Sequence, residues 1–187
     1  MILIETQKAT LDDLHRVPGK AELVGERIVH FMSTGLRPGR VARNILFLIA
    51  EFLHHFGRGE VLADNVGYAI PKLPSGRQSF SPDVSYYDGP EPDDDMEFIP
   101  GAPAFAIEVR SKDGYGKAAL KAASAKRADY FAAGTKVVWD VDTQAECIHV
   151  YSMTEPTIAR TFKRGESADA EPALPGWRVG VDAIFRK

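Results

Sequence analysis

Two acidic residues and one lysine in this sequence have the types and neighbours that a metal-dependent phosphodiesterase site needs. Asp83 stands in "SFSPDVSYYDG" and Glu108 in "AFAIEVRSKD", two short runs with the alternation of strands, and Lys126 follows in an alanine-rich run. Carboxylate oxygens are the ligands that Mg²⁺ or Mn²⁺ takes, and water and substrate phosphate complete the shell. A nearby ammonium then orients that water or neutralises the charge that develops on the phosphate.

The charges of "AFAIEVRSKD" share one face of the expected strand. Side chains alternate along an extended chain, so the apolar Phe105, Ile107 and Val109 point to one side while Glu108 and Arg110 point to the other. A guanidinium is no general base at neutral pH and instead suits bidentate contact with phosphate or carboxylate. We therefore expect a substrate-binding or structural role for Arg110.

Lys126 lies in the middle of a small apolar helix face. At about 100° per residue, the run 115–134 places four alanines and Tyr130 around Lys126, with Lys117 and Lys121 on the opposite side. Such a face approaches a sheet closely, and an ammonium pressed against a sheet needs an anion. The alternative is that the lysine stem runs along the alanines to solvent.

The elements that must position these residues form a mixed set. The sequence predicts a short helix capped near Thr10, a hairpin from about Ala21 and a long helix that stops at Gly57. Antiparallel strands are expected over 60–88, followed by an exposed acidic loop. The strand, helix, strand order over 104–142 favours a crossover between parallel neighbours, followed by a hairpin partner and small closing strands. The expected fold class is α/β (mixed α+β), a central mixed sheet flanked by helices.

Length, charge and cysteine usage limit the expected number of domains, the class of partner and the cellular compartment. At 187 residues and 44% hydrophobic, the chain suits one domain over residues 1–187. The formal charge of -3 argues against a constitutive nucleic-acid binder, although a local basic rim remains open. The single Cys147 fits a reducing cytoplasm, and neither a secretory signal nor a membrane-spanning run is expected. The candidate rim comprises Arg37, Arg40, Arg43, Lys112, Lys117, Lys121 and Arg127.

Other reactive groups receive structural interpretations. The acidic run at 93–97 lacks the glycine and terminal glutamate of a calcium loop. His30 and His149 are expected to be partly buried, hydrogen-bonded residues of strands. Cys147 has no clear base near it in the sequence, which disfavours a thiol nucleophile.

Five fragments in order resemble a known family. They are "AELVGERIV", "SPDVSYYDG", "AFAIEVRSKD", "KRADYFAAGTKVVWDVD" and "LPGWRVGVDAIF". Together, from about Ala21 to Phe185, they are similar to the Uma-type restriction endonucleases, a branch of the PD-(D/E)xK nuclease superfamily. The resemblance implies a restriction-endonuclease-like core with the active site on adjacent strands.

The resemblance also implies roles for individual residues. Asp83 and Glu108 match the two acidic positions, and Arg110 stands where the superfamily's usual lysine would be. Lys126 matches a lysine displaced to the following helix, and Glu22 resembles an additional acidic residue that assists the metal. A histidine that often opens the long helix in this family is replaced by the sequence "RPGRVARN".

The expected function is therefore a Mg²⁺- or Mn²⁺-dependent DNA endonuclease of the cytoplasm with Asp83, Glu108 and Lys126 as catalytic residues. A homodimer suits the cutting of both strands, because symmetry then supplies two active sites. Two alternatives stay open. One is a catalytically inactive nucleic-acid or protein-binding domain that retains the nuclease fold, and the other is a small-molecule phosphohydrolase.

Overall fold

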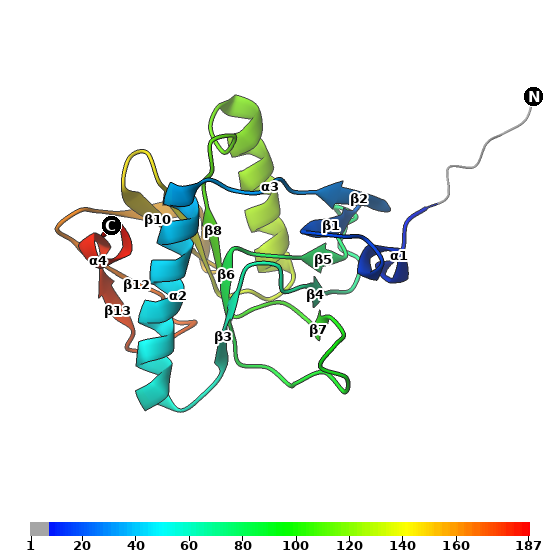
Figure 1. Ribbon diagram of the computed structural model, residues 1–187, viewed down its shortest axis with the longest axis horizontal. Helices are drawn as coiled ribbons and strands as arrows, with labels where there is room; N and C mark the ends of the chain where they lie inside the picture. The colour runs from blue at the N-terminus through cyan, green and yellow to red at the C-terminus, as the bar shows by residue number, and fades with distance from the viewer. Residues whose placement is uncertain (1–7) are drawn as a thin grey trace, which may run out of the picture.

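The computed structural model describes residues 8–187 and is built around a six-stranded mixed sheet (Figure 1). The strand order is β11-β10-β9-β8-β6-β3; β8 and β9 pair in parallel and the other neighbours are antiparallel. The expected mixed α/β class with a central sheet is confirmed. The strands are β3 (Glu60–Ala63), β6 (Val84–Tyr87), β8 (Phe105–Val109), β9 (Val137–Asp142), β10 (Cys147–Ser152) and β11 (Glu155–Lys163).

The predicted crossover is present between β8 and β9. Helix α3 (Lys117–Ala132) connects these two parallel strands, and β10 then returns antiparallel to β9. Glu108 lies beside Asp140 in the parallel register. The strand, helix, strand pattern therefore places α3 next to the sheet face that carries Glu108.

One face of the sheet is covered by α2 (Leu36–Phe56) and the C-terminal elements β12 (Ser167–Asp169), β13 (Arg178–Gly180) and α4 (Val181–Ile184) (Figure 1). Val41, Ile45 and Ile49 recur at helical spacing and are buried against this face. The helix ends as predicted at Gly57, which takes the left-handed conformation with φ of 69° and donates its N–H to Leu53.

The opposite face carries α3 and a three-stranded sheet of β4 (Tyr68–Ala69), β5 (Ser79–Phe80) and β7 (Ile99–Pro100). Phe80 stacks on Tyr130 of α3 with ring centroids 4.1 Å apart. This second, smaller core fixes the orientation of α3 over the central sheet.

The hairpin of β1 (Ala21–Val24) and β2 (Arg27–His30) packs beside β5 at the edge of this second core. Leu23 donates its N–H to Ser79 Oγ at 2.7 Å, and Gly25 donates to the Gly76 carbonyl at 2.9 Å. Helix α1 (Leu11–His15) precedes it, with Thr10 and Asp13 forming a capping box. These contacts bring residues 10–30 to the face that carries Glu108.

Two expectations about local structure are wrong. Residues 181–184 form α4 rather than an extended segment, because Val181 and Ile184, three positions apart, bury one helical face while Asp182 lies in the first turn. His30 is exposed, because most of β2 lies at the surface.

None of the helices within residues 8–187 has both the length and the apolar character that crossing a membrane requires. The first seven residues, on which part of the expectation about a secretory signal rests, lie outside the described residues.

Candidate active site

Asp83 and Glu108 come from adjacent strands and line the same cavity. Asp83 directly precedes β6, and its N–H donates to the carbonyl of Ile107 in β8 at 3.1 Å. Both carboxylates border a cavity of about 620 Å³, here called the main cavity. Its walls are the central sheet, one face of α3 and the segment 31–34 that joins β2 to α2. The structure therefore brings the two acidic residues together.

Each of these carboxylates is oriented through one oxygen. Asp83 Oδ2 accepts the N–H of Val109 at 2.7 Å, which leaves Oδ1 for a charged partner. Glu108 Oε1 accepts the Tyr130 hydroxyl at 2.7 Å, and its Oε2 has no hydrogen-bonding partner among residues 8–187. The Glu108 side chain keeps 30% of its surface exposed. One oxygen of each carboxylate is thus oriented, while Glu108 Oε2 is open and Asp83 Oδ1 is paired with Lys20.

Lys126 reaches both Glu108 and Glu22 from α3. Its Nζ lies 2.8 Å from Glu108 Oε1 and 2.8 Å from Glu22 Oε1, and only 12% of the side chain is exposed. The main cavity is lined by three alanines of the same helix face, as the helical projection predicts: Ala119, Ala122 and Ala123. The alternative in which the lysine runs along these alanines to solvent does not fit this position.

Glu22 is the buried counter-ion of this lysine. It is 1% exposed, and both of its oxygens are engaged: Oε1 by Lys126 and the N–H of Ser81, and Oε2 by Arg77. Arg77 also donates to Asp129 at 2.8 Å. With its oxygens occupied by protein donors, Glu22 is placed to hold Lys126, and it lies behind the cavity wall rather than on it.

Lys20 and Asp64 belong to the same cluster and were not singled out from the sequence. Lys20 Nζ lies 2.6 Å from Oδ1 of Asp83 and 2.6 Å from Oδ1 of Asp64. The sequence contains a hint for each residue. Lys20 stands two positions before Glu22 in a strand-like run, so their side chains share a face. Asp64 directly follows β3 and Asp83 directly precedes β6, but only the pairing of these two strands shows that the two aspartates are neighbours.

Arg110 is committed to two aspartates of β9. Its Nε and Nη2 donate to the two oxygens of Asp140 at 2.6 and 2.7 Å, and its Nη1 donates to Asp142 at 2.9 Å. The side chain borders the main cavity, but its fork of donors is filled by carboxylates. This geometry favours the structural role over phosphate binding.

The charges of the cluster set the protonation of its members. Burial alone would lower the pKa of Lys126, but the carboxylates of Glu108 and Glu22 outweigh it and raise that pKa. Burial raises the pKa of Glu108, and Lys126 offsets this only in part while Asp83 adds to it. Lys126 is therefore a cation at neutral pH, suited to stabilise negative charge rather than to accept a proton.

Comparison with known proteins identifies the family. Residues 11–182 match the Uma2 family, which is described as "Putative restriction endonuclease". The chain belongs to the Uma2 family. The expected resemblance is confirmed, since this match covers most of the sequence.

A solved structure shares the fold of this Uma2 protein. It is the crystal structure of "a putative nuclease belonging to DUF820" from Anabaena variabilis ATCC 29413, with a TM-score of 0.75. The two sequences are 14% identical, and the alignment covers 94% of this chain and 97% of that one. At this identity the likeness shows the fold. No curated protein matches the chain.

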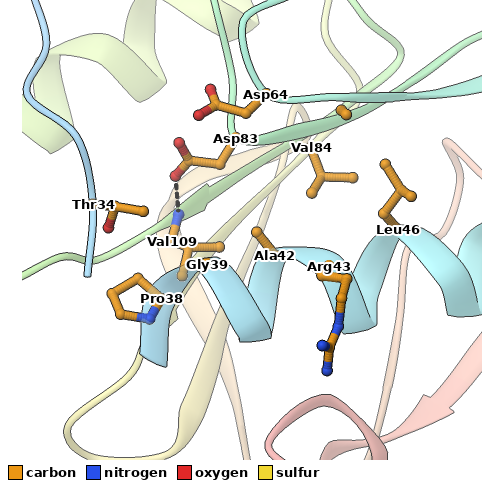
Figure 2. Close-up of a pocket in the computed structure, with 11 residues that line it drawn as sticks. Thr34, Pro38, Gly39, Ala42, Arg43, Leu46, Asp64, Asp83, Val84 and Val109 are labelled. Carbon is orange, nitrogen blue, oxygen red and sulfur yellow. Dashed lines mark hydrogen bonds between the residues drawn. The ribbon is translucent and has the colours of Figure 1, made fainter. Parts of the chain in front are cut away.

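A smaller cavity of about 270 Å³ lies behind Asp83 in the Uma2 protein (Figure 2). It is bordered by the first turns of α2, including Pro38 and Ala42, and shares Thr34, Asp64, Asp83 and Val109 with the main cavity. Figure 2 shows the Asp64 and Asp83 carboxylates turned to the same side. These two acidic residues therefore stand between the two cavities.

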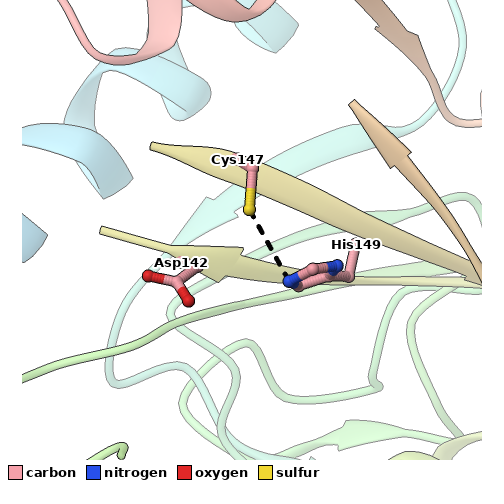
Figure 3. Close-up of side chains that lie close together, drawn as sticks. All are labelled: Asp142, Cys147 and His149. Carbon is pink, nitrogen blue, oxygen red and sulfur yellow. Dashed lines mark hydrogen bonds between the residues drawn. The ribbon is translucent and has the colours of Figure 1, made fainter. Parts of the chain in front are cut away.

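A second cluster lies at the turn from β9 to β10, next to Arg110, and consists of Asp142, Cys147 and His149 (Figure 3). Cys147 Sγ lies 3.6 Å from His149 Nε2, so the expectation that the thiol has no base nearby is wrong; alternation puts both residues on one strand face. His149 is partly buried and bonds Thr161, as expected.

This second cluster is a poor metal site. Asp142 Oδ1 accepts from the Tyr115 hydroxyl and from the N–H groups of Gln144 and Ala145, and Oδ2 accepts from Arg110. Protein donors thus occupy the lone pairs that an ion would need, and burial raises the pKa of the Cys147 thiol. The arrangement favours a structural interpretation.

Proposed function

We propose that this Uma2 protein is a divalent-metal-dependent endonuclease that hydrolyses phosphodiester bonds in DNA. The observation that carries the proposal is the meeting of Asp83 and Glu108 in one cavity with Lys126, which is largely shielded from solvent and paired to Glu108. Membership of a family described as "Putative restriction endonuclease" and a fold shared with a protein described as "a putative nuclease" support the same reaction class.

The donor set fits Mg²⁺ or Mn²⁺. Asp83 Oδ1 and Glu108 Oε2 are the carboxylate oxygens that the backbone and Tyr130 leave for an ion, and hard divalent ions prefer one or two carboxylates plus water. The linked ion pairs also carry more negative than positive groups: five carboxylates meet three cations. The carboxylates are Glu22, Asp64, Asp83, Glu108 and Asp129, and the cations are Lys20, Arg77 and Lys126.

The chain's own groups have distinct parts in this reaction. A bound divalent ion supplies an acidified water and offsets phosphate charge. Lys126 stands beside Glu108 as a fixed cation, where it orients the attacking water or stabilises the charge that develops on the phosphate. Glu22 holds the ammonium from behind, and the Tyr130 hydroxyl fixes the Glu108 carboxylate. Arg110 contributes by bracing β8 against β9.

The basic rim expected for DNA binding is only partly gathered at the cavities. Arg127 borders the main cavity and Arg43 the smaller one, whereas Arg37 is paired with Glu146. Positive charge next to the site thus comes from few groups, so binding should be weak and should depend only modestly on salt. A homodimer that presents two sites would raise the effective affinity for a duplex and cut both strands.

The test is cleavage of supercoiled and linear DNA by the purified chain with Mg²⁺, with Mn²⁺ and with EDTA. Asp83→Asn and Glu108→Gln should lower cleavage by at least about 100-fold, because each removes a proposed ion ligand. Glu155→Gln on the exposed edge strand β11 is the matched control for loss of a carboxylate. Activity in both site variants equal to that of Glu155→Gln would overturn the proposed site.

The same experiment separates the alternatives. Wild-type protein that binds DNA but leaves it intact with every ion supports an inactive binding domain with the nuclease fold. Hydrolysis of a small phosphodiester such as bis-p-nitrophenyl phosphate, with DNA left intact, supports a small-molecule phosphohydrolase. The position of Lys126 in the main cavity, paired with Glu108, favours an enzyme over an inactive binding domain, because it places a fixed cation beside the proposed ion ligands.

A further inference from the structure

Lys20 bridges two acidic residues at the centre of the candidate site. Its ammonium lies 2.6 Å from Asp83 Oδ1 and 2.6 Å from Asp64 Oδ1, and the side chain is 15% exposed. The Lys20 carbonyl accepts the N–H of Phe31 at 2.9 Å, so the backbone at the base of this side chain is held by the β1–β2 hairpin. The lysine therefore reaches Asp83 from an anchored position.

The Asp83 oxygen that Lys20 contacts is the one that a divalent ion would need. Asp83 Oδ2 is held by the N–H of Val109, which leaves Oδ1 as the oxygen free to bind a cation. An ammonium and a divalent ion on the same oxygen would lie within a few ångströms of each other and repel strongly. Lys20 and the ion therefore compete for Asp83 Oδ1.

Asp64 gives the lysine a second anchor that does not depend on Asp83. It directly follows β3, half of its side chain is exposed, and it borders both cavities (Figure 2). A lysine displaced from Asp83 can keep its bond to Asp64. Its charge then stays at the mouth of the main cavity, where it can face substrate.

We propose that Lys20 is a second phosphate-binding lysine of this site, which holds Asp83 until a divalent ion takes its place and then, still paired with Asp64, binds a substrate phosphate. The inference rests on the proposed function, since it assumes the ion at Asp83 and DNA as substrate. It adds a residue from the N-terminal hairpin to the residues of the sheet and of α3.

The first test is calorimetric titration of the full chain with Mn²⁺ in the absence of DNA. Lys20→Met should bind Mn²⁺ at least about fivefold more tightly than wild type, because the competing cation is gone. Arg127→Met is the matched control: it removes one positive charge from the same cavity wall, but Arg127 stacks on Tyr151 and makes no ion pair among residues 8–187. This control should tighten Mn²⁺ binding much less.

The second test is binding of a short mixed-sequence DNA duplex, followed by fluorescence anisotropy with and without Ca²⁺, which is used to occupy the ion site. With Ca²⁺, Lys20→Met should weaken binding about fivefold and reduce the salt slope by about one. Without Ca²⁺, wild type and Lys20→Met should bind alike, because the ammonium is then held by the two aspartates. Thermal unfolding checks each variant, and Lys20→Gln replaces Lys20→Met if the latter is unstable.

The outcomes separate this inference from the proposed function. Lys20→Met that binds Mn²⁺ no more tightly than Arg127→Met, or that loses DNA affinity equally with and without Ca²⁺, would overturn the exchange of Lys20. Asp83→Asn that keeps wild-type Mn²⁺ affinity would instead remove the ion from Asp83 and overturn the proposed site itself. Weak binding in Asp83→Asn together with tight binding in Lys20→Met supports both.

Discussion

Lys126 is the residue at which stability and the proposed chemistry depend on the same contacts. Its ammonium is shared by Glu108, which faces the main cavity, and by Glu22, which is almost completely buried. Removing one partner of a buried ion pair leaves the other charge uncompensated, and this commonly costs about 3–5 kcal/mol. Arg77 still neutralises Glu22 in part. Loss of the lysine should therefore destabilise the fold, and lost cleavage alone would not identify its role.

A double-mutant cycle separates the effect of Lys126 on stability from its effect on cleavage. Lys126→Met should lower the free energy of unfolding in urea by about 3 kcal/mol, and adding Glu22→Gln should restore part of it because the stranded carboxylate is gone. Cleavage of DNA should stay lost in the restored double variant. A double variant that regains cleavage along with stability would show that Lys126 acts only by holding the fold, and strictly additive effects on stability would contradict the pairing.

At the scale of elements, the β1–β2 hairpin supplies both Lys20 and Glu22, and its docking depends on a contact between two glycine turns. Gly25 at the hairpin turn donates its N–H to Gly76, and both have positive φ. A Cβ on Gly76 would lie 2.9 Å from Gly25 Cα, whereas a Cβ on Gly25 meets nothing within 4 Å. There is thus space for a side chain at Gly25 but not at Gly76.

This asymmetry gives a matched pair of variants. Gly25→Ala should cost about 1–2 kcal/mol through its left-handed backbone alone. Gly76→Ala should cost more, because the backbone of the hairpin must also move. It should also tighten Mn²⁺ binding, because a displaced Lys20 no longer competes for Asp83. Urea unfolding and calorimetry provide the two readouts. Equal losses of unfolding free energy in the two variants would contradict a role for the close approach of Gly76 to Gly25.

The elements also show which parts of the site were accessible from sequence. Period-two alternation put Glu108 opposite the apolar face of β8, and the helical period put Lys126 on the face that lines the main cavity. Lys20, Asp64 and Arg77 reach the cluster by contacts between segments that are far apart in the chain. Alternation and strand ends hint at Lys20 and Asp64 only once the pairing of these segments is known, so their part in the site required the structure.

At the scale of the whole molecule, the two faces of the central sheet differ in character: one is apolar and the other carries charged residues. The face beneath α2 is an apolar core in which Trp139 and Trp177 stack at 5.3 Å, and the C-terminal segment closes it. The other face holds the ion pairs of the candidate site. Arg160 of edge strand β11 secures the closing segment through a bidentate contact with Asp169, at 3.0 and 2.8 Å.

This contact makes acid stability of the molecule depend on Asp169. The hydrogen bonds from Arg160 lower the pKa of the Asp169 carboxyl, and burial opposes them only in part. Because the folded pKa lies below the unfolded value of about 3.9, the stabilisation is present above that pH and is lost as the pH falls through the folded pKa. Arg160→Met should therefore move the midpoint of acid unfolding to higher pH, as followed by tryptophan fluorescence.

Arg164→Met is the control, because it removes a similarly exposed guanidinium whose carboxylate partners, Glu146 and Asp182, are more exposed than Asp169. An equal shift in both variants would assign the effect to net charge rather than to Asp169.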